Sequence, residues 1–302
     1  VYTLPLGAII RYHGLQYSIY ADDTQVYLSF DLKDATNALQ KLNSCLSDIR
    51  SWMIENKLKI NDDKTEFLII ASPHSHKKIT DNHSLTVGNS SIDPSSSAKN
   101  LGVIFDDNMT MEKQVSNICK SANFQLRNIG SIRKCLNDTA AAQLVHSLIT
   151  SRLDYCNSLL GGIPDAQIER LQRVQNNAAR IVARLKKFDH ITPTLKSLHW
   201  LPVKYRIEFK TLLLTYRILN DSAPSYLKDL ITPYKQSRSL RSGDKLLLSV
   251  PRSKTKSYGD RCFSFRAPKA WNALPLDIRS SQNISSFKSS VKTHLFKNAY
   301  KC

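Results

Sequence analysis

The sequence predicts an α+β fold that passes into a mainly helical, basic region, and three observations lead to this fold class. Short runs of strand-favouring residues in the first third of the chain flank one amphipathic helical stretch. From Met111 onward, apolar residues recur at the three-and-four spacing of helices. The 302 residues carry a formal net charge of +18, and 41% of them are hydrophobic, enough for a packed core. That charge predicts a polyanionic partner, nucleic acid first and an anionic membrane surface second.

The opening residues predict a helix followed by a hairpin. Residues 3–14 are typical of the end of a helix that closes at Gly14. Residues 15–20 and 24–30 favour strands, and a tight turn at 21–23 would join them. A longer helix follows, because its apolar residues share one face: Leu39, Leu42, Leu46, Ile49, Trp52 and Met53.

Three further strand predictions complete an antiparallel sheet with covering helices that ends near Phe105. They cover residues 64–72, residues 83–93 with a hairpin turn at Gly88–Asn89, and residues 99–107.

The rest of the chain predicts helices. Apolar faces run through 111–129 and 145–156, and the sequence Gly-Gly-Ile-Pro at 161–164 breaks the pattern. Asp165 would cap a third helix, and a fourth would cover Val203 to Leu219. The composition then shifts toward Ser, Lys and Arg between Pro233 and Pro268.

Two adjacent carboxylates, Asp22 and Asp23, lie at the tip of the predicted hairpin. Carboxylates that converge at a turn repel each other unless a cation lies between them. Mg²⁺ takes such oxygen ligands together with substrate phosphates, and a pair of metals about 3.5–4 Å apart can assist displacement at phosphorus. The alternative is an ordinary solvated turn, where Asp is common.

The sequence Tyr20-Ala21-Asp22-Asp23 resembles the catalytic hairpin of reverse transcriptases, and its continuation to Phe30 is similar to the non-LTR (LINE-type, Jockey/chicken-repeat-like) retrotransposon branch. Further segments resemble that family in the same order, so the resemblance covers nearly the whole chain: residues 52–70, 99–107, 152–164, 171–182 and 199–207.

The resemblance implies catalytic and metal-binding roles for Asp22 and Asp23, with Asp22 as the principal Mg²⁺ ligand and Tyr20 beside the primer end. Lys64 would lie near the phosphates of the incoming nucleotide, where a cation or general acid assists pyrophosphate departure. A solvated lysine at the start of a strand is the alternative for Lys64.

The resemblance also implies a primer-positioning role for Leu101 and Gly102, for which a strand glycine that permits close backbone approach is a compatible explanation. It assigns a partial palm to residues 1–105, a helical thumb to 106–162, a helical C-terminal domain to 163–232 and a basic segment to 233–302.

Basic residues on the third predicted helix give a second candidate site. Arg173, Arg180, Arg184 and Lys187 are seven, four and three residues apart and would share the face opposite the apolar stripe. They could follow a phosphate backbone, or they could form a solvated helix face. Aromatic residues among the later cations could stack on unpaired bases or be buried in a basic linker: Tyr258, Phe263 and Phe265.

The family needs a third carboxylate, a glycine-rich nucleotide-pocket segment and fingers, and none of these is visible before Tyr20. We therefore expect the C-terminal part of an RNA-directed DNA polymerase, cut within the palm and inactive alone. Its partners would be an RNA template, a DNA primer, deoxynucleoside triphosphates and the missing N-terminal palm, fingers and endonuclease region of the same polyprotein.

Two alternatives remain open at this point. One is a non-catalytic nucleic-acid-binding remnant of a decayed element, and the weaker one is a different metal-dependent phosphodiesterase built on the aspartate pair. The six scattered cysteines form no C-x-x-C pair, which predicts reduced thiols of an intracellular protein. The resemblance implies a nuclear site of action, and no apolar run approaches the roughly 18 residues of a membrane span.

Overall fold

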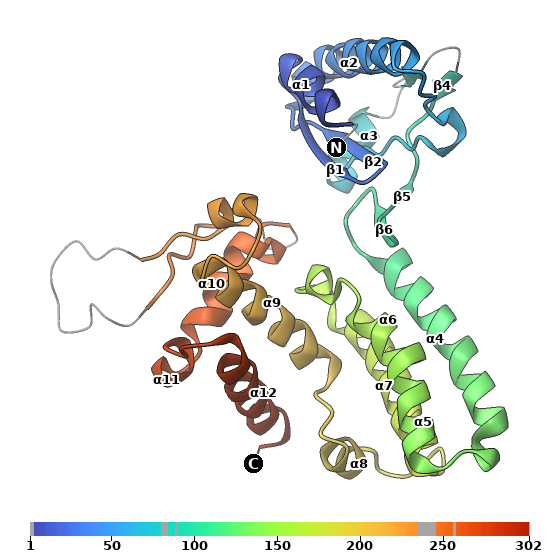
Figure 1. The fold of residues 1–302 in the computed structure, drawn as a ribbon, viewed down its shortest axis with the longest axis vertical. Coiled ribbons are helices and arrows are strands. Elements are labelled where there is room, and N and C mark those ends of the chain that lie inside the picture. The colour runs from blue at the N-terminus through green and yellow to red at the C-terminus, as the bar shows by residue number, and fades with distance from the viewer. Residues whose placement is uncertain (1–2, 80–83, 88–89, 235–245, 256–257, 302) are drawn as a thin grey trace, which may run out of the picture. The chain divides into compact units, whose positions relative to one another are not determined.

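A computed structural model describes residues 3–79, 84–87, 90–234, 246–255 and 258–301. The chain divides into two compact units, Val1–Thr110 and Met111–Cys302. The first contains helices and three two-stranded sheets, and the described part of the second is mainly helical (Figure 1). The coarse prediction of a mixed α and β protein is therefore confirmed.

The first unit is built on a hairpin and two helices. Helix α1 (Leu4–Tyr12) precedes strands β1 (Gln16–Tyr20) and β2 (Asp23–Tyr27), and helix α2 (Ala35–Glu55) follows them. The strands pair antiparallel from Gln16↔Tyr27 to Tyr20↔Asp23. This confirms the predicted hairpin and the helix before Gly14, which has a φ of +69°. A core around Leu6, Ile10, Cys45 and Ile49 holds α1, α2 and the inner face of the hairpin together.

The predicted strand at residues 64–72 is wrong. A short 3₁₀ turn, η2 (Asp62–Lys64), leads into extended chain whose one bridge joins Phe67 to Pro94, and helix α3 (Pro73–Ile79) follows. The backbone of this segment bonds to loop residues instead of a sheet ladder: Ser95 N donates to Phe67 O at 2.7 Å, and Ala71 N donates to Asp107 O at 3.1 Å. Its apolar run reflects burial of residues such as Ile69, which is compatible with extended loop as well as with strand.

Two further hairpins occupy the end of the unit. Strands β3 (Leu85–Val87) and β4 (Ser90–Ile92) pair antiparallel, and the predicted turn at Gly88–Asn89 lies outside the described residues. The single strand predicted at residues 99–107 is wrong, because β5 (Ser97–Asn100) and β6 (Val103–Asp106) form a hairpin there. Its turn residues Leu101 and Gly102 have φ of +43° and +84°, the sign that a type I′ turn requires at both positions to match strand twist.

Helices make up the described part of the second unit. Helix α4 packs along α7, and α9 packs against α10 and α12 (Figure 1). The predicted fourth helix is confirmed at both ends. Helix α7 does begin at Asp165, but Pro164 occupies the cap position and the Asp165 side chain makes no capping bond. The α-helices are α4 (Glu112–Ile132), α5 (Asp138–Val145), α6 (Ser151–Asp154), α7 (Asp165–Ala183), α8 (Thr192–Ser197), α9 (Val203–Leu219), α10 (Phe263–Asn272), α11 (Leu276–Arg279) and α12 (Ile284–Tyr300).

Short turns of other helix types connect them. They are the 3₁₀ helices η3 (Arg133–Cys135), η5 (Asn157–Leu160), η6 (Ser225–Leu230) and η7 (Gly259–Arg261), and the π-helix η4 (His146–Thr150). In the first unit the remaining 3₁₀ turn is η1 (Leu32–Asp34).

Aromatic packing anchors the C-terminal helices on α9. Phe287 of α12 stacks on Tyr216 of α9 at 4.2 Å between ring centroids and on Trp271 of α10 at 5.7 Å. The hydroxyl of Tyr300 donates to Trp200 O at 2.6 Å, and burial raises the pKa of Tyr300 to about 12. The helices before and after residue 233 therefore share one hydrophobic core.

Two further properties of the described residues concern helix hydropathy and the state of the thiols. None of their helices combines the length and apolarity needed to cross a bilayer. Their five cysteines are free, with Cys45 buried and Cys135 and Cys262 exposed. Burial raises the pKa of Cys45 to about 11, so this thiol stays protonated.

Candidate functional site

The β1–β2 hairpin turns its two faces to different surroundings. Because strand residues alternate between faces, Tyr17, Ile19 and Val26 point to the core while Tyr20 and Asp23 share the outer face as a directly opposed pair. Tyr20 is 66% exposed, and Asp23 is exposed beside it. The alternation and register of the two strands thus place the Tyr20 ring and the Asp23 carboxylate together on an accessible surface.

The turn at the tip of this hairpin consists of Ala21 and Asp22. Ala21 has a φ of +54°. Glycine adopts this left-handed conformation readily, but it costs a residue with a Cβ about 1–2 kcal/mol. Asp22 and Asp23 are both exposed. Within the part of the chain that the structure describes, neither carboxylate forms a hydrogen bond or an ion pair. Both remain available to a ligand.

The donors at this turn do not by themselves make a two-metal centre. Mg²⁺ can bind through one or two carboxylates when water and phosphates complete its shell, and Asp22 and Asp23 supply such a pair. Among the described residues, however, no three His, Cys, Asp or Glu side chains gather as a metal-binding group. We therefore derive no catalytic step through a metal from these residues.

A side-chain hydrogen bond joins the hairpin to the turn at Leu101–Gly102. Gln25 lies two residues beyond Asp23 on the same outer face, and its amide donates to Asn100 Oδ1. Asn100 is the last residue of β5, directly before Leu101, which is 41% exposed. The two predicted substrate-facing turns are thus tied together although 75 residues separate Gln25 from Asn100.

The segment that carries Lys64 meets the same strand. Lys64 is exposed at the end of η2. Two residues later, Glu66 Oε2 accepts a hydrogen bond from Lys99 N of β5 at 2.8 Å. The Lys64 segment, the Leu101–Gly102 turn and the Tyr20–Asp23 hairpin therefore form a continuous set of contacts through Glu66, Lys99, Asn100 and Gln25.

The linking residues escaped the sequence analysis. Nothing local in the sequence marks Glu66, Gln25 or Asn100, since each is an ordinary polar residue at a position that favours solvent. Only the pairing of distant segments gives them a partner.

The four predicted helix cations do not share one helical face. Helix α7 ends at Ala183, because Arg184 takes a left-handed φ of +54°, so Lys187 lies beyond the helix. Arg180 is half-buried and donates to Asp189 O at 3.3 Å, while Arg184 donates to Leu136 O at 3.0 Å and lies 3.6 Å from Asp138. Arg173 is exposed beside Glu169. The prediction of a single face is therefore wrong.

The three aromatic residues near the C-terminus do not form an open stacking surface. Phe263 packs against the core of the second unit, and Phe265 and Tyr258 are half-buried. Lys269 places its ammonium 5.8 Å from the centre of the Phe265 ring. Of the cations that surround them in sequence, those at 235–245 and 256 lie outside the described residues.

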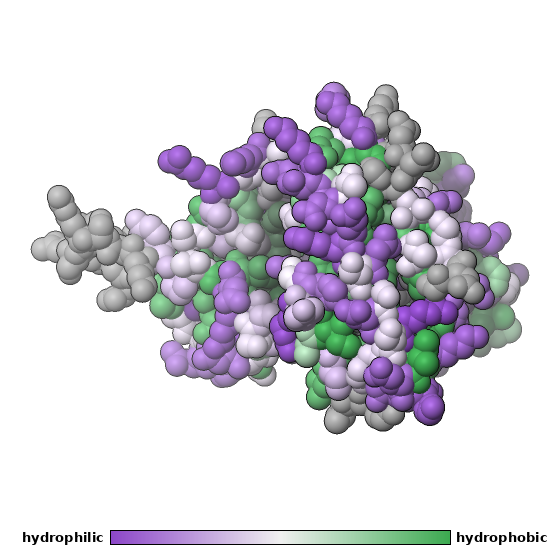
Figure 2. Space-filling model, turned by 90° about the horizontal axis from the view of Figure 1, so that it is seen from above, coloured by the Kyte–Doolittle hydropathy of each residue, from purple (hydrophilic) through white to green (hydrophobic). Residues whose placement is uncertain are grey.

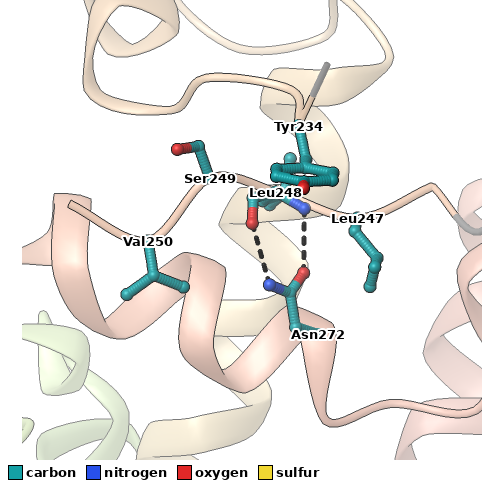
Figure 3. A pocket seen from close by; sticks show the side chains of 6 residues that line it. All are labelled: Tyr234, Leu247, Leu248, Ser249, Val250 and Asn272. Carbon is teal, nitrogen blue, oxygen red and sulfur yellow. Dashed lines mark hydrogen bonds between the residues drawn. The ribbon is translucent and has the colours of Figure 1, made fainter. Parts of the chain in front are cut away.

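A shallow pocket of about 280 Å³ in the second unit contains none of the predicted site residues. Figure 3 shows its floor, where the Asn272 amide accepts from Leu248 N and donates to Leu248 O, both at 2.8 Å. Tyr234, Leu247, Ser249 and Val250 complete the lining. The backbone of Leu248 thus already engages the Asn272 amide.

Hydrophilic side chains, purple in Figure 2, cover much of the face drawn there, with hydrophobic residues scattered between them. This surface agrees with a chain that has 43 Lys and Arg residues. Comparison with protein-family models, with curated proteins and with solved structures finds no match to this chain. The site must therefore be interpreted from its own geometry and from the resemblance of its motifs.

Proposed function

We propose that this chain supplies the catalytic hairpin and the nucleic-acid-binding helices of an RNA-directed DNA polymerase of the non-LTR retrotransposon type. The observation that supports it most is the exposed Tyr20–Asp23 tip, whose outer face connects through Gln25 and Asn100 to the Leu101–Gly102 turn. A polymerase needs carboxylates next to a surface that positions the primer end. Hydrogen bonds connect the three segments that resemble the family, which supports assigning this task to them.

In this proposal the residues of the chain have separate tasks. Asp22 and Asp23 contribute two of the carboxylates that hold Mg²⁺, which when bound supplies charge neutralisation at the triphosphate. Tyr20 offers a ring beside them for the primer end, and Lys64 offers a cation for the departing pyrophosphate. The remaining carboxylate would come from the upstream palm strand that the resemblance implies, so this chain alone is expected to be inactive.

Primer extension on an RNA template tests this proposal. The chain alone and a version extended upstream in its reading frame are compared with Mg²⁺ and deoxynucleoside triphosphates. We expect extension only from the longer version, and Asp22→Asn in it should lower the rate by at least 10²-fold, because a metal ligand is lost. Asp31→Asn, at another exposed carboxylate of the first unit, is the matched control and should leave the rate unchanged.

A second candidate function is nucleic-acid binding without catalysis. It is favoured by the lack of a third metal ligand among the described residues together with the net charge of +18. In that case both versions would bind oligonucleotides with affinity that falls as salt rises, and neither would extend a primer. If the longer version binds oligonucleotides but extends no primer, the result supports this second function.

A further inference from the structure

Residues 184–191 connect α7 to α8, and they present the most exposed large hydrophobic side chain of the described residues. Phe188 is 90% exposed. A phenylalanine ring in water costs about 1.5–3 kcal/mol relative to a buried one, so this turn gives up that stabilisation to keep the ring at the surface. The connection contains no other exposed large hydrophobic side chain, since Leu185 and Ile191 are half-buried.

Local hydrogen bonds build this turn and hold the ring outward. Asp189 N donates to Lys186 O at 3.3 Å, which closes a β-turn with Lys187 and Phe188 at its two central positions. The Asp189 carboxylate accepts from Lys186 N at 2.7 Å, and Asp189 O accepts from Arg180 of α7 at 3.3 Å. The turn is therefore fixed to the helix, and the exposure of Phe188 follows from its position at the tip.

Positive charge lies close to the ring. The ammonium of Lys187 lies 5.5 Å from the centre of the Phe188 ring, and Lys186, two positions earlier in the same turn, is exposed. The acidic groups nearby are already engaged, Asp189 by the backbone of Lys186 and Asp138 by Arg133 and Arg184. Neither Lys186 nor Lys187 forms an ion pair with any described residue.

We propose that the Lys186–Asp189 turn is a binding site for single-stranded nucleic acid, in which an unpaired base stacks on Phe188 while Lys186 and Lys187 contact the flanking phosphates. An open aromatic face with adjacent cations is the arrangement that binds single strands without reading their sequence. The site rests on the proposed function in requiring nucleic acid as the partner, and it adds the strand type and the contacting residues.

A membrane surface fits the turn less well. Loops and helices that enter a bilayer interface bury several apolar side chains, and this turn presents one. A base, in contrast, needs a single ring face. The cations next to Phe188 would then serve phosphates of the same strand, about one nucleotide to each side.

Equilibrium binding of a fluorescent 20-nucleotide single strand to the full chain tests the proposal. Phe188→Ala should weaken binding roughly tenfold, the loss of about one base stack, without changing the dependence on salt. Phe188→Tyr should keep the affinity of the original chain, because it keeps the ring. Lys187→Ala should instead flatten the plot of log K against log salt by about 0.7, the value for one phosphate contact.

Two controls separate this site from general effects. Phe124→Ala removes another exposed phenylalanine, on α4, and should bind the single strand as the original chain does. A blunt duplex of the same length should bind Phe188→Ala and the original chain within twofold of each other, because its bases are stacked internally.

The outcomes are distinct. If the original chain binds the single strand and Phe188→Ala binds it equally well, the stacking site is overturned while the proposed function stands. If the original chain binds no nucleic acid, both are overturned. Loss of binding to anionic lipid vesicles by Phe188→Ala, with oligonucleotide binding intact, would also overturn the site and assign the turn to a membrane surface.

Discussion

Gly7 of α1 decides how closely the helix approaches the β1–β2 hairpin. A Cβ at this position would lie 2.4 Å from the Tyr17 hydroxyl oxygen and 2.6 Å from Cζ of the same ring. Gly7→Ala would gain about 1 kcal/mol of helix propensity but lose about 1–3 kcal/mol through overpacking, as well as the Arg11–Tyr17 hydrogen bond. We expect a net destabilisation of about 1–2 kcal/mol, measured by denaturant unfolding.

Gly130 of α4 provides the matched control for Gly7→Ala. A Cβ there meets nothing nearer than Ile181 Cδ1 at 4.0 Å, so Gly130→Ala should stabilise the chain by up to about 1 kcal/mol. Equal effects of the two substitutions would show that the contact with Tyr17 is unimportant.

Glu208 of α9 should make stability depend on pH. Burial raises the pKa of its carboxyl above the ordinary 4.5, against the opposing effects of Arg266, Lys204 and His294. The unfolded chain then releases this proton first, so the contribution of Glu208 lowers the free energy of unfolding as pH rises from about 4.5 through the folded pKa.

Glu208→Gln should remove that loss. We expect the variant to be more stable than the original chain at pH 7 and nearly equal to it at pH 4, measured by urea unfolding at both values. Glu169→Gln, at an exposed glutamate of α7, should show no such difference. A variant that is less stable at pH 7 would mean that the attraction between Glu208 and Arg266 outweighs burial.

At the scale of elements, one buried arginine joins the end of α7 to the start of α5. Arg133 is 8% exposed and donates to Ile181 O at 2.7 Å, Val182 O at 2.8 Å and Leu136 O at 2.7 Å. It also pairs with Asp138 at 2.5 Å, which lowers the pKa of that carboxyl. The guanidinium thereby satisfies carbonyls that the end of α7 leaves without helical partners.

Arg133→Met keeps the volume of the side chain and removes these donors. We expect a loss of about 3–5 kcal/mol, because three backbone carbonyls lose a charged hydrogen-bond donor. Arg173→Met on α7 is the control and should change stability by less than about 0.5 kcal/mol, since its pair with Glu169 is exposed and 4.0 Å long. Calorimetric melting of both variants measures the difference, and a similar small shift in each would contradict the role of Arg133.

At the scale of the whole molecule, regular periodicity made much of the fold predictable. Helix α9 could be placed to the residue because its apolar spacing is continuous between Pro202 and Asn220. The β1–β2 hairpin was found because strand-favouring runs flank a short polar turn. The predictions failed where a single residue other than glycine takes a left-handed conformation. Leu101 ends a strand and Arg184 ends a helix in this way, and neither residue type indicates such an end in the sequence.

The candidate site could be predicted only in part. The exposed Asp22–Asp23 tip follows from local sequence, because a two-residue turn must lie between the paired strands. Its connection to the Leu101–Gly102 turn depends on Gln25 and Asn100, which meet only after the chain has folded. Phe188 could not be identified as a site from the sequence. The prediction extended the helix through Lys187, whereas α7 ends at Ala183 and Phe188 is exposed on the turn that follows.

The left-handed Ala21 has a consequence for how the tip would meet a ligand. Glycine would adopt this backbone more easily but would also let the tip sample many other conformations. The alanine methyl group restricts those alternatives, so the two carboxylates enter any encounter with their backbone already ordered. Less conformational entropy is then lost on association, and this gain offsets part of the backbone strain at Ala21.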